Sequence, residues 1–364
     1  MRKARFEICH VNLAKGFRGG ERQTELLVKG LAEQDIAQAV VLRAGAGLED
    51  RLRGLPQVTV RPVGSNLLAA VLASRGARLL HAHEGRAVHV AYLRKRLSGT
   101  PYVVTRRVNN SPKRGWFTRL VYRRADAMVA LSQAVRRTLA DWQRGIDARV
   151  IPSALSGLKR DPENVRRLKD RFAGKFLVGH VGALDRATKG QQFLIQAARE
   201  IENTHPNLQF VFIGEGRDEA RLRREAEGLG NVTFAGFAGN VGDWLSAFDL
   251  FAFPSLQEGL GSILLDALDF ALPVVASDVG GVPDVIVHGE NGLLVPPGNS
   301  AALKDAILAL HADSARRRAM GRAARDDAGR FTAERMVAAY LEVYRGIVPG
   351  LGRNQTRRRR HAAL

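Results

Sequence analysis

Residues 250–268 read LFAFPSLQEGLGSILLDAL, and this stretch indicates a strand, a tight turn and a helix in succession. The apolar run 250–253 has the length and aromatic content of a buried strand, and Pro254 interrupts it. Apolar residues then recur with helical spacing from Ile263 onward. A strand that leads through a short turn into a helix is the repeating unit of α/β proteins.

The turn inside this stretch suits a ligand that carries both phosphate and hydroxyl groups. Gly259 and Gly261 lack a Cβ atom, so the backbone can approach a ligand closely. The start of the helix leaves N–H groups without partners at the positive end of the helix dipole, where anions bind. Glu258 and Asp266 add two carboxylates, eight positions apart. Amides for a diphosphate and carboxylates for hydroxyls together favour a nucleotide sugar.

The same stretch resembles the E-x7-E signature of retaining glycosyltransferases of family 4, which have the GT-B fold. The continuation ALPVVASD at 271–278 and NGLLV at 291–295 has the order and spacing of that family. Asp266 is a departure, because the family has Glu there. The resemblance implies that Glu258 contacts the donor sugar and that the second acid contacts the ribose. It also implies that the diphosphate lies on the backbone around Gly259, Leu260, Gly261, Ser262 and Ile263.

A second turn carries the cations expected beside a diphosphate. Residues 181–190, VGALDRATKG, resemble the family turn G-R-L-x-x-x-K-G, whose Arg and Lys bind the donor pyrophosphate. Lys189 matches the family lysine, whereas Ala183 stands at the arginine position, and Arg186 could substitute for it. Such cations stabilise the departing nucleoside diphosphate as its charge grows. Two further donor contacts are implied by family-like segments after the next strands: Gly214 and Phe237.

The beginning of the chain is typical of a Rossmann-like domain. A strand-type run, FEICHV at 6–11, precedes the Gly-rich segment GFRGGERQTELLV at 16–28, which leads into an amphipathic helix. The turn lacks the G-x-G-x-x-G spacing of a dinucleotide site. It resembles the G-G-x-E-R turn of the family, which implies that Gly19 and Gly20 lie near the donor phosphates or the acceptor.

Two strand ends in the first half carry polar side chains, in ARLLHAHE at 77–84 and PYVVTRRVN at 101–109. The carboxyl ends of parallel strands face the ligand crevice. We therefore predict a catalytic role for His83, with a structural histidine pair as the alternative. One of Arg106 and Arg107 is predicted to bind an anionic acceptor. The alternative is a solvated or membrane-facing arginine.

The charge of the chain is concentrated in its first half. The net charge is +20, and residues 1–155 hold 28 Lys or Arg against 11 Asp or Glu, a net +17. Such a surface favours anionic partners: nucleic acid, lipid headgroups or a phosphorylated substrate. We expect no nucleic-acid partner, because no DNA- or RNA-binding signature accompanies the charge. The basic, aromatic segment 113–124 predicts docking on an anionic membrane surface, with an ordinary helix that has a core face as the alternative.

Several classes of protein are disfavoured by the sequence. No apolar run reaches the roughly 18 residues of a membrane span, and charges within residues 1–10 argue against a signal peptide. The single cysteine, Cys9, excludes a disulfide within the chain. We expect a cytoplasmic protein, peripheral on the inner face of the cytoplasmic membrane. No D-x-D motif lies at a strand end, so we expect no metal and no cofactor other than the nucleotide sugar as co-substrate.

A length of 364 residues suggests two domains. The resemblance implies an α/β protein of the GT-B fold, in which two Rossmann-like β/α/β domains face a deep cleft and the C-terminal helix crosses back to the first domain. The predicted parts are an acceptor domain at 1–155, a linker at 156–173, a nucleotide-sugar donor domain at 174–330, a returning helix at 331–348 and a disordered basic tail at 349–364.

The function implied by the resemblance is a retaining, metal-independent glycosyltransferase. It would move a sugar from a nucleoside-diphosphate sugar to a glycan or glycolipid, such as lipopolysaccharide core or a related bacterial surface polysaccharide. The basic first half suggests an anionic glycolipid or phosphorylated glycan as acceptor. Two alternatives stay open: a sugar-nucleotide 2-epimerase of the same fold, and a catalytically silent protein that binds polyanions or nucleotides. Asp266 and Ala183 are the best support for the silent protein.

Overall fold

The computed structural model describes residues 5–113 and 115–352, and the chain divides into two compact units. The first unit consists of residues 1–154 and 332–364, and the second of residues 155–331. Each unit is built on one parallel β-sheet with helices around it. Within the described ranges, no helix is both long enough and apolar enough to span a bilayer.

The first unit has a seven-stranded parallel sheet in the order β3-β2-β1-β4-β5-β6-β7. The strand order reverses between β1 and β4, and ligands of open α/β sheets bind outside the carboxyl ends at such a point. Its strands are β1 (Phe6–Asn12), β2 (Gln38–Arg43), β3 (Val58–Val63), β4 (Ala77–Ala82), β5 (Tyr102–Arg106), β6 (Ala127–Ala130) and β7 (Ala148–Val150). Its helices are α1 (Gly19–Glu33), α2 (Gly47–Leu52), α3 (Leu67–Ala73), α4 (Gly85–Ser98), α5 (Trp116–Arg123), α6 (Gln133–Trp142) and α15 (Ala333–Ile347).

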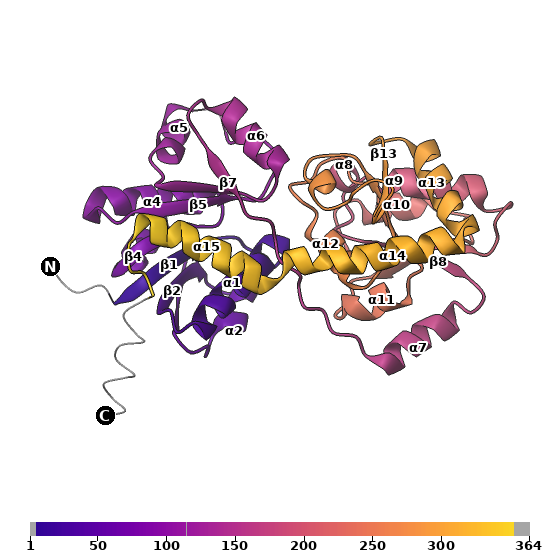
Figure 1. Cartoon of the computed structure of the whole chain (residues 1–364), viewed down its shortest axis with the longest axis horizontal. Coiled ribbons are helices and arrows are strands. Elements are labelled where there is room, and N and C mark those ends of the chain that lie inside the picture. Colours follow the sequence, from indigo (N-terminus) through magenta and orange to yellow (C-terminus); the bar gives the residue numbers. More distant parts are fainter. Residues whose placement is uncertain (1–4, 114, 353–364) are drawn as a thin grey trace. The chain divides into compact units, whose positions relative to one another are not determined.

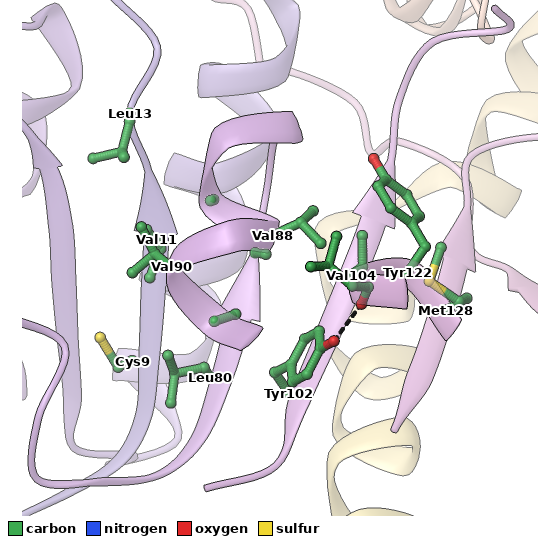
Figure 2. Close-up of a cluster of buried hydrophobic side chains, with 14 of the residues drawn as sticks. Cys9, Val11, Leu13, Leu80, Val88, Val90, Tyr102, Val104, Tyr122 and Met128 are labelled. Carbon is green, nitrogen blue, oxygen red and sulfur yellow. Dashed lines mark hydrogen bonds between the residues drawn. The ribbon is translucent and has the colours of Figure 1, made fainter. Parts of the chain in front are cut away.

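One face of this sheet packs against helices α3 to α6 through a continuous apolar cluster, part of which Figure 2 shows. Cys9 and Leu80 lie on the neighbouring strands β1 and β4 inside it. The Tyr102 hydroxyl donates a hydrogen bond to the carbonyl oxygen of Val121, so this buried polar group is satisfied. Burial raises the pKa of the Cys9 thiol to about 12, which leaves it unreactive.

The opposite face of the first sheet is covered by α1 and by α15 from the far end of the chain. Figure 1 shows α15, in yellow, lying beside α1. Val337 and Tyr340 of α15 pack against Leu27 and Leu31 of α1 in one buried cluster. The sequence expectation that the C-terminal helix returns to the first domain is therefore confirmed.

The second unit has a six-stranded parallel sheet in the order β10-β9-β8-β11-β12-β13, which reverses between β8 and β11. Its strands are β8 (Phe176–Val181), β9 (Leu208–Ile213), β10 (Val232–Gly236), β11 (Leu250–Phe253), β12 (Val274–Ser277) and β13 (Gly292–Val295). Its helices are α7 (Pro162–Arg171), α8 (Arg186–Lys189), α9 (Gln191–Ile201), α10 (Glu219–Glu225), α11 (Val241–Ala247), α12 (Ser262–Asp269), α13 (Ser300–Ala312) and α14 (Ser314–Ala328).

Two segments of the predicted domain plan have a different place in the structure. The residues expected to form a linker, 156–173, belong to the second unit and contain α7, which packs against α11. Of the predicted tail at 349–364, residues 349–352 form turns within the first unit, and residues 353–364 lie outside the described residues.

The contact between α1 and α15 gives a stability prediction. A Cβ atom added at Gly30 of α1 would lie 2.6 Å from Val337 Cγ2 of α15. We expect Gly30→Ala to lower the free energy of unfolding by about 1–3 kcal/mol, because a well-packed interface resists extra volume. Urea denaturation followed by circular dichroism measures this change.

The matched control is Gly346→Ala in α15, where an added Cβ would meet nothing within 4 Å. This change is expected to stabilise the protein slightly, since Ala favours a helix over Gly by roughly 1 kcal/mol. In the Gly30→Ala background, Val337→Ala is expected to cost less than it does alone. Additive effects of these two substitutions would contradict the packing argument.

Candidate active site

A lysine and a glutamate meet where the two central strands of the second sheet end. Strands β8 and β11 are hydrogen-bonded neighbours, so the turns that follow them lie at the same edge of the sheet. Lys189, at the end of α8, donates a hydrogen bond from Nζ to Glu258 Oε1. The Ser255 hydroxyl donates to the same carboxylate oxygen at 3.1 Å. These are two of the side chains for which the sequence predicts catalytic roles.

The backbone of the two turns is joined at close range. The carbonyl oxygen of Thr188 accepts hydrogen bonds from Leu256 N at 2.8 Å and Gln257 N at 3.2 Å. Gly190 has a φ angle of +65°, and a Cβ atom there would lie 2.1 Å from the Pro254 carbonyl oxygen. Only glycine fits both the conformation and the space. The backbone thus fixes Lys189 next to the turn that carries Glu258.

The predicted phosphate-binding amides lie at the start of α12, which begins at Ser262. Gly261 precedes the helix with φ +82°, a conformation that favours glycine. The first-turn N–H groups of a helix have no partner within it, and the helix dipole is positive at this end. Residues 259–263, which are predicted to hold a diphosphate, therefore follow Glu258 directly and lead into the first turn of α12. Lys189 contacts the carboxylate of Glu258.

Asp266 has a contact that the sequence did not predict. It lies in α12, its residue is only 4% exposed, and its Oδ1 atom accepts a hydrogen bond from Ser156 N at 2.7 Å. Ser156 follows Leu155, where the second unit begins. The Asp266 carboxylate therefore holds the beginning of the second unit against α12. The contact of Asp266 with a ribose stays a prediction.

Arg186 is held away from the Lys189–Glu258 pair. Its Nη2 atom lies 3.0 Å from Glu225 Oε1 at the end of α10, and its backbone N–H donates to Asp218 at 2.8 Å. The two cations of the α8 turn thus contact two different carboxylates. With Ala183 at the family arginine position, the structure places Lys189 as the cation paired with Glu258.

The two remaining predicted donor contacts follow neighbouring strands. Gly214, after β9, has φ +131°, and a Cβ atom there would lie 2.1 Å from the Gly182 carbonyl oxygen. This glycine therefore permits a close approach of two turns. Phe237, after β10, has a residue exposure of 75%, which is unusual for a phenylalanine and leaves its ring available.

Another buried histidine, His180, lies on β8 just before these turns. The sequence did not point to this residue. The Gln191 amide donates to His180 Nε2 at 3.3 Å, so the other ring nitrogen, Nδ1, carries the proton and donates to Ala252 O at 3.0 Å. Burial lowers the pKa of His180 to about 4, so the ring is neutral. It links β8 to β11 just before the functional turns. Its only signal in the sequence is a polar residue inside an apolar strand.

Three histidines of the first unit, His10, His81 and His83, form a buried group at the carboxyl ends of β1 and β4. His83 Nε2 lies 2.9 Å from His10 Nδ1, and His83 Nδ1 lies 3.3 Å from Arg107 Nη2. His81 lies 2.7 Å from both the Thr105 and Tyr344 hydroxyls. His83 is 3% exposed, and burial holds its pKa well below the usual value for histidine. Both ring nitrogens of His83 already have protein partners.

The same three histidines also form the group whose spacing could suit a metal ion. Among the described residues, it is the group whose ligand atoms all lie within 4.8 Å of one another: His10, His81 and His83. In the structure, however, these nitrogens hydrogen-bond to protein partners. The arrangement is that of a hydrogen-bonded cluster, and no metal role is inferred from it.

The two consecutive arginines at the end of β5 differ in their surroundings. Arg106 Nη2 donates hydrogen bonds to two oxygen atoms of Asn110, the backbone carbonyl oxygen at 2.5 Å and the side-chain oxygen at 2.6 Å. Arg107 extends along the first turn of α1, where a Cβ atom added at Gly20 would lie 3.4 Å from Arg107 Cδ. Gly19 and Gly20, both predicted to lie near a ligand, begin this helix.

Both halves of the chain match a known family. Residues 17–155 match the family described as "Glycosyltransferase Family 4", and residues 175–313 match "Glycosyl transferases group 1". Alpha-D-kanosaminyltransferase of Streptomyces kanamyceticus is 30% identical over 261 residues, which cover 64% of this chain and 67% of that one. The chain belongs to glycosyltransferase family 4. It is therefore a transferase of sugars.

Other relatives of this glycosyltransferase match over different lengths. Lipopolysaccharide core biosynthesis glycosyltransferase LpsE of Rhizobium meliloti is 27% identical over 349 residues, covering 93% of this chain and 98% of LpsE. Putative glycosyltransferase EpsD of Bacillus subtilis is 34% identical over 159 residues, covering 43% of this chain and 42% of EpsD. The crystal structure of Anabaena HepE has a TM-score of 0.81 at 23% identity, covering 93% of this chain and 99% of HepE. This last likeness confirms the GT-B fold.

The buried histidines give a pH prediction for the glycosyltransferase. The pKa values of His10 and His180 are lowered to about 4 by burial, and those of His81 and His83 are also lowered. As pH falls below about 6.5, the unfolded chain therefore binds protons that the folded chain does not. The contribution of these neutral histidine rings to stability is complete above about pH 6.5 and is lost as pH falls toward about 4.

We expect the free energy of unfolding to fall between pH 6.5 and pH 5, with a limiting slope of about 1.4 kcal/mol per pH unit for each neutral histidine. Urea denaturation at pH 7, 6 and 5 measures this slope. A free energy of unfolding that is constant over this interval would contradict the assignment of neutral, buried rings.

Proposed function

We propose that this protein transfers a sugar, with retention of anomeric configuration and without a metal ion, from a nucleoside-diphosphate sugar to a glycan or glycolipid. The observation that carries the proposal is the contact of Lys189 with Glu258 at the reversal of strand order in the second sheet. Ligands of open α/β sheets bind at this position. The start of α12 follows directly from the turn that carries Glu258, and the N-terminus of a helix favours an anion.

Each proposed role follows from the chemistry of the group. Lys189 and the amides of residues 259–263 hold the diphosphate, whose charge grows as the bond to the sugar breaks. Glu258 orients the hydroxyls of the donor sugar. Lys189 contacts the Glu258 carboxylate, and donor binding is proposed to place a phosphate beside the same ammonium group. A protein cation and helix amides supply the positive charge, so the reaction needs no metal.

Retention is proposed to follow the front-face course that is usual for the family. The acceptor hydroxyl attacks the anomeric carbon from the side of the leaving group, and its proton passes to a phosphate oxygen of the departing diphosphate. This course needs no protein nucleophile and no protein base. Glu258 and Lys189 then act by orienting the sugar and by stabilising the leaving group.

Solved relatives support the donor class. Structures of Anabaena HepE hold UDP, UDP-glucose, or UDP with glucose. In this chain, Gly214 and the exposed ring of Phe237 are proposed to border the nucleotide. Asp266, in the same helix as Ser262 and Ile263, is proposed to contact the ribose.

The acceptor is proposed to be an anionic glycolipid or a phosphorylated glycan, such as lipopolysaccharide core. The basic character of the first half, a net +17 for residues 1–155, supports an anionic acceptor. The extended match to LpsE, whose printed name refers to lipopolysaccharide core biosynthesis, supports the glycan class. Gly19, Gly20 and Arg107 lie together at the start of α1 and could contact such a group.

A specific observation favours a second candidate, a silent protein that binds nucleotides or polyanions. The family arginine is replaced by Ala183, and Arg186 contacts Glu225 instead of the Lys189–Glu258 pair. A diphosphate would then lack one of its two expected cations. Binding without turnover would distinguish this candidate from the transferase. For the epimerase, no observation in the structure adds support.

The proposed roles predict the effects of two substitutions on turnover. We expect Glu258→Gln and Lys189→Met each to lower kcat about 100-fold or more, because each removes a charge that acts on the reacting groups. The measurement is nucleoside diphosphate release from UDP-, GDP-, ADP- and CDP-sugars with extracted bacterial glycolipid, with and without EDTA. Activity of the wild type is expected to survive EDTA.

Lys304→Met is the matched control, because it removes another lysine–glutamate pair of the second unit, Lys304–Glu200. It is expected to leave kcat nearly unchanged. If nucleotide binds but no donor turns over with any acceptor extract, the silent protein becomes the better explanation. Release that continues unchanged in Glu258→Gln would remove this carboxylate from the mechanism.

Membrane docking is proposed for the face of the first unit that contains α5. Trp116 is 78% exposed and Phe117 is 37% exposed on this short helix, and Arg119 and Arg123 are exposed beside them. The same helix buries Val121 and Tyr122, so it has a core face as well as an exposed one. Exposed aromatics together with cations suit the interface of an anionic bilayer, here proposed to be the inner face of the cytoplasmic membrane.

This proposal predicts binding to vesicles that contain phosphatidylglycerol and little binding to pure phosphatidylcholine. Arg119→Gln and Arg123→Gln are each expected to weaken binding about 5-fold, since one cation near an anionic surface contributes about 1 kcal/mol. Co-sedimentation at two salt concentrations measures the effect. Arg136→Gln on α6 is the control for charge alone, and an equal loss in this variant would argue against a site at α5.

A further inference from the structure

Four side chains of the first unit form a hydrogen-bonded series with a single direction. Gln38 donates from Nε2 to the Val28 carbonyl oxygen at 3.0 Å, so its Oε1 atom must accept the bond from His10 Nε2 at 3.0 Å. His10 is neutral, because burial lowers its pKa to about 4, and its Nδ1 therefore has a lone pair. That lone pair accepts the proton of His83 Nε2 at 2.9 Å.

The end of the series is an arginine. Since the proton of the neutral His83 ring is on Nε2, its Nδ1 atom is an acceptor and takes a hydrogen bond from Arg107 Nη2 at 3.3 Å. Gln38, His10 and His83 are 0%, 0% and 3% exposed, so water does not compete for these bonds. A proton added to His83 would place two N–H donors face to face. The series is therefore built to hold Arg107 and not to exchange protons.

The surroundings of His83 strengthen this assignment. The ring of His81 lies against that of His83, with centroids 3.9 Å apart. His81 is itself held by the hydroxyl of Tyr344 on α15 and by Thr105 on β5. Strands β1, β2, β4 and β5 and helix α15 all contribute side chains, so the position of the acceptor atom is determined by the core of the unit.

Arg107 has donors left for a ligand. Its Nε atom is buried and has no hydrogen-bond partner among the described residues. Its side chain runs along Gly20 in the first turn of α1, where the helix dipole also favours an anion. Arg106 also has a buried Nε atom without a partner among the described residues, but its Nη2 atom bonds to Asn110, which is exposed. Of the two arginines, Arg107 is the one whose Nη2 atom is held by a buried side chain, that of His83.

We propose that Arg107 binds an anionic group of a substrate, a phosphate or a carboxylate, and that His83 is a positioning residue that orients the guanidinium. This inference rests on the proposed transferase function. It assigns to His83 a role different from acid–base catalysis. A guanidinium that is already oriented loses less side-chain freedom when the anion binds.

The test is a double-mutant cycle with a conservative variant. Arg107→Met is expected to raise the KM of the anionic substrate about 10- to 100-fold, as for loss of a charged hydrogen bond. His83→Leu is expected to raise the same KM about 10-fold and to leave kcat within about 2-fold. In the Arg107→Met background, His83→Leu should have no further effect on KM.

His83→Asn is the rescue variant, because its Oδ1 atom stands near the position of the histidine Nδ1 and accepts a hydrogen bond. It should retain a KM within about 3-fold of the wild type. Urea denaturation of all variants separates loss of stability from loss of binding, and Arg136→Ala, an exposed arginine on α6, serves as control. The pH profile of kcat should be the same in the wild type and in His83→Asn.

Two arms of the experiment identify the source of the anion. A change in the KM of the nucleotide sugar, or in the calorimetric affinity for the nucleoside diphosphate, assigns the diphosphate of the donor. A change in the acceptor KM that is absent with phosphatase-treated glycolipid assigns an acceptor phosphate. A KM change that persists with treated acceptor assigns a carboxylate. Each of these outcomes supports the inference.

Other outcomes overturn it. A loss of kcat without a change in KM in His83→Leu would return His83 to a catalytic role. Equal effects of His83→Leu with and without Arg107 would leave His83 as a structural residue only. If the wild type transfers no sugar, the proposed function fails, but calorimetry with inorganic pyrophosphate and with phosphorylated glycolipid still tests Arg107. Binding that is equal in the wild type, Arg107→Met and His83→Leu would then refute the inference.

Discussion

Each sheet depends on a buried histidine that has to remain uncharged. His10 is the fifth residue of β1 and His180 is the fifth residue of β8, and both rings are fully buried. Each ring bonds to a neighbouring strand or to the segment that follows one: His10 to Gln38 and His83, and His180 to Ala252. Charging such a ring would bury an ion without a counter-charge, which is costly. The bonds fix the ends of the strands from which the functional turns begin.

The sequence predicts the local parts of the site well and their pairing poorly. The strand, turn and helix at 250–269 could be read from apolar spacing and two glycines, and the roles of Glu258 and Lys189 were inferred from resemblance. Their contact joins residues 69 positions apart, which no local pattern encodes. Arg186 shows the limit of such reasoning, because a loop position does not tell which way a long side chain points. Its carboxylate partner, Glu225, lies on another element.

The same limit explains the domain plan. The apolar periodicity of the strand–turn–helix units is a strong signal, and the plan of two Rossmann-like domains was implied by the family resemblance. Helix α7, within the predicted linker, has no buried residue and a highly charged sequence. Its only apolar residues are Val165 and Leu168, which are half-buried, and so short a stripe does not indicate the unit to which this helix belongs. The buried histidine series was equally hidden, since its direction follows from the orientation of one glutamine amide.

The discontinuity of the first unit affects the order in which the chain can fold on the ribosome. Residues 155–331 form one uninterrupted unit, whereas the first sheet receives one of its covering helices, α15, only after all of these residues have been made. Until Tyr340 and Tyr344 emerge, apolar side chains such as Leu31 lack part of their packing, and the hydroxyl partner of His81 is absent. The unit that is begun first is therefore completed after the second. A nascent chain of this enzyme exposes an unfinished N-terminal core while its second unit already has all its residues, and a truncated product would remain in that state.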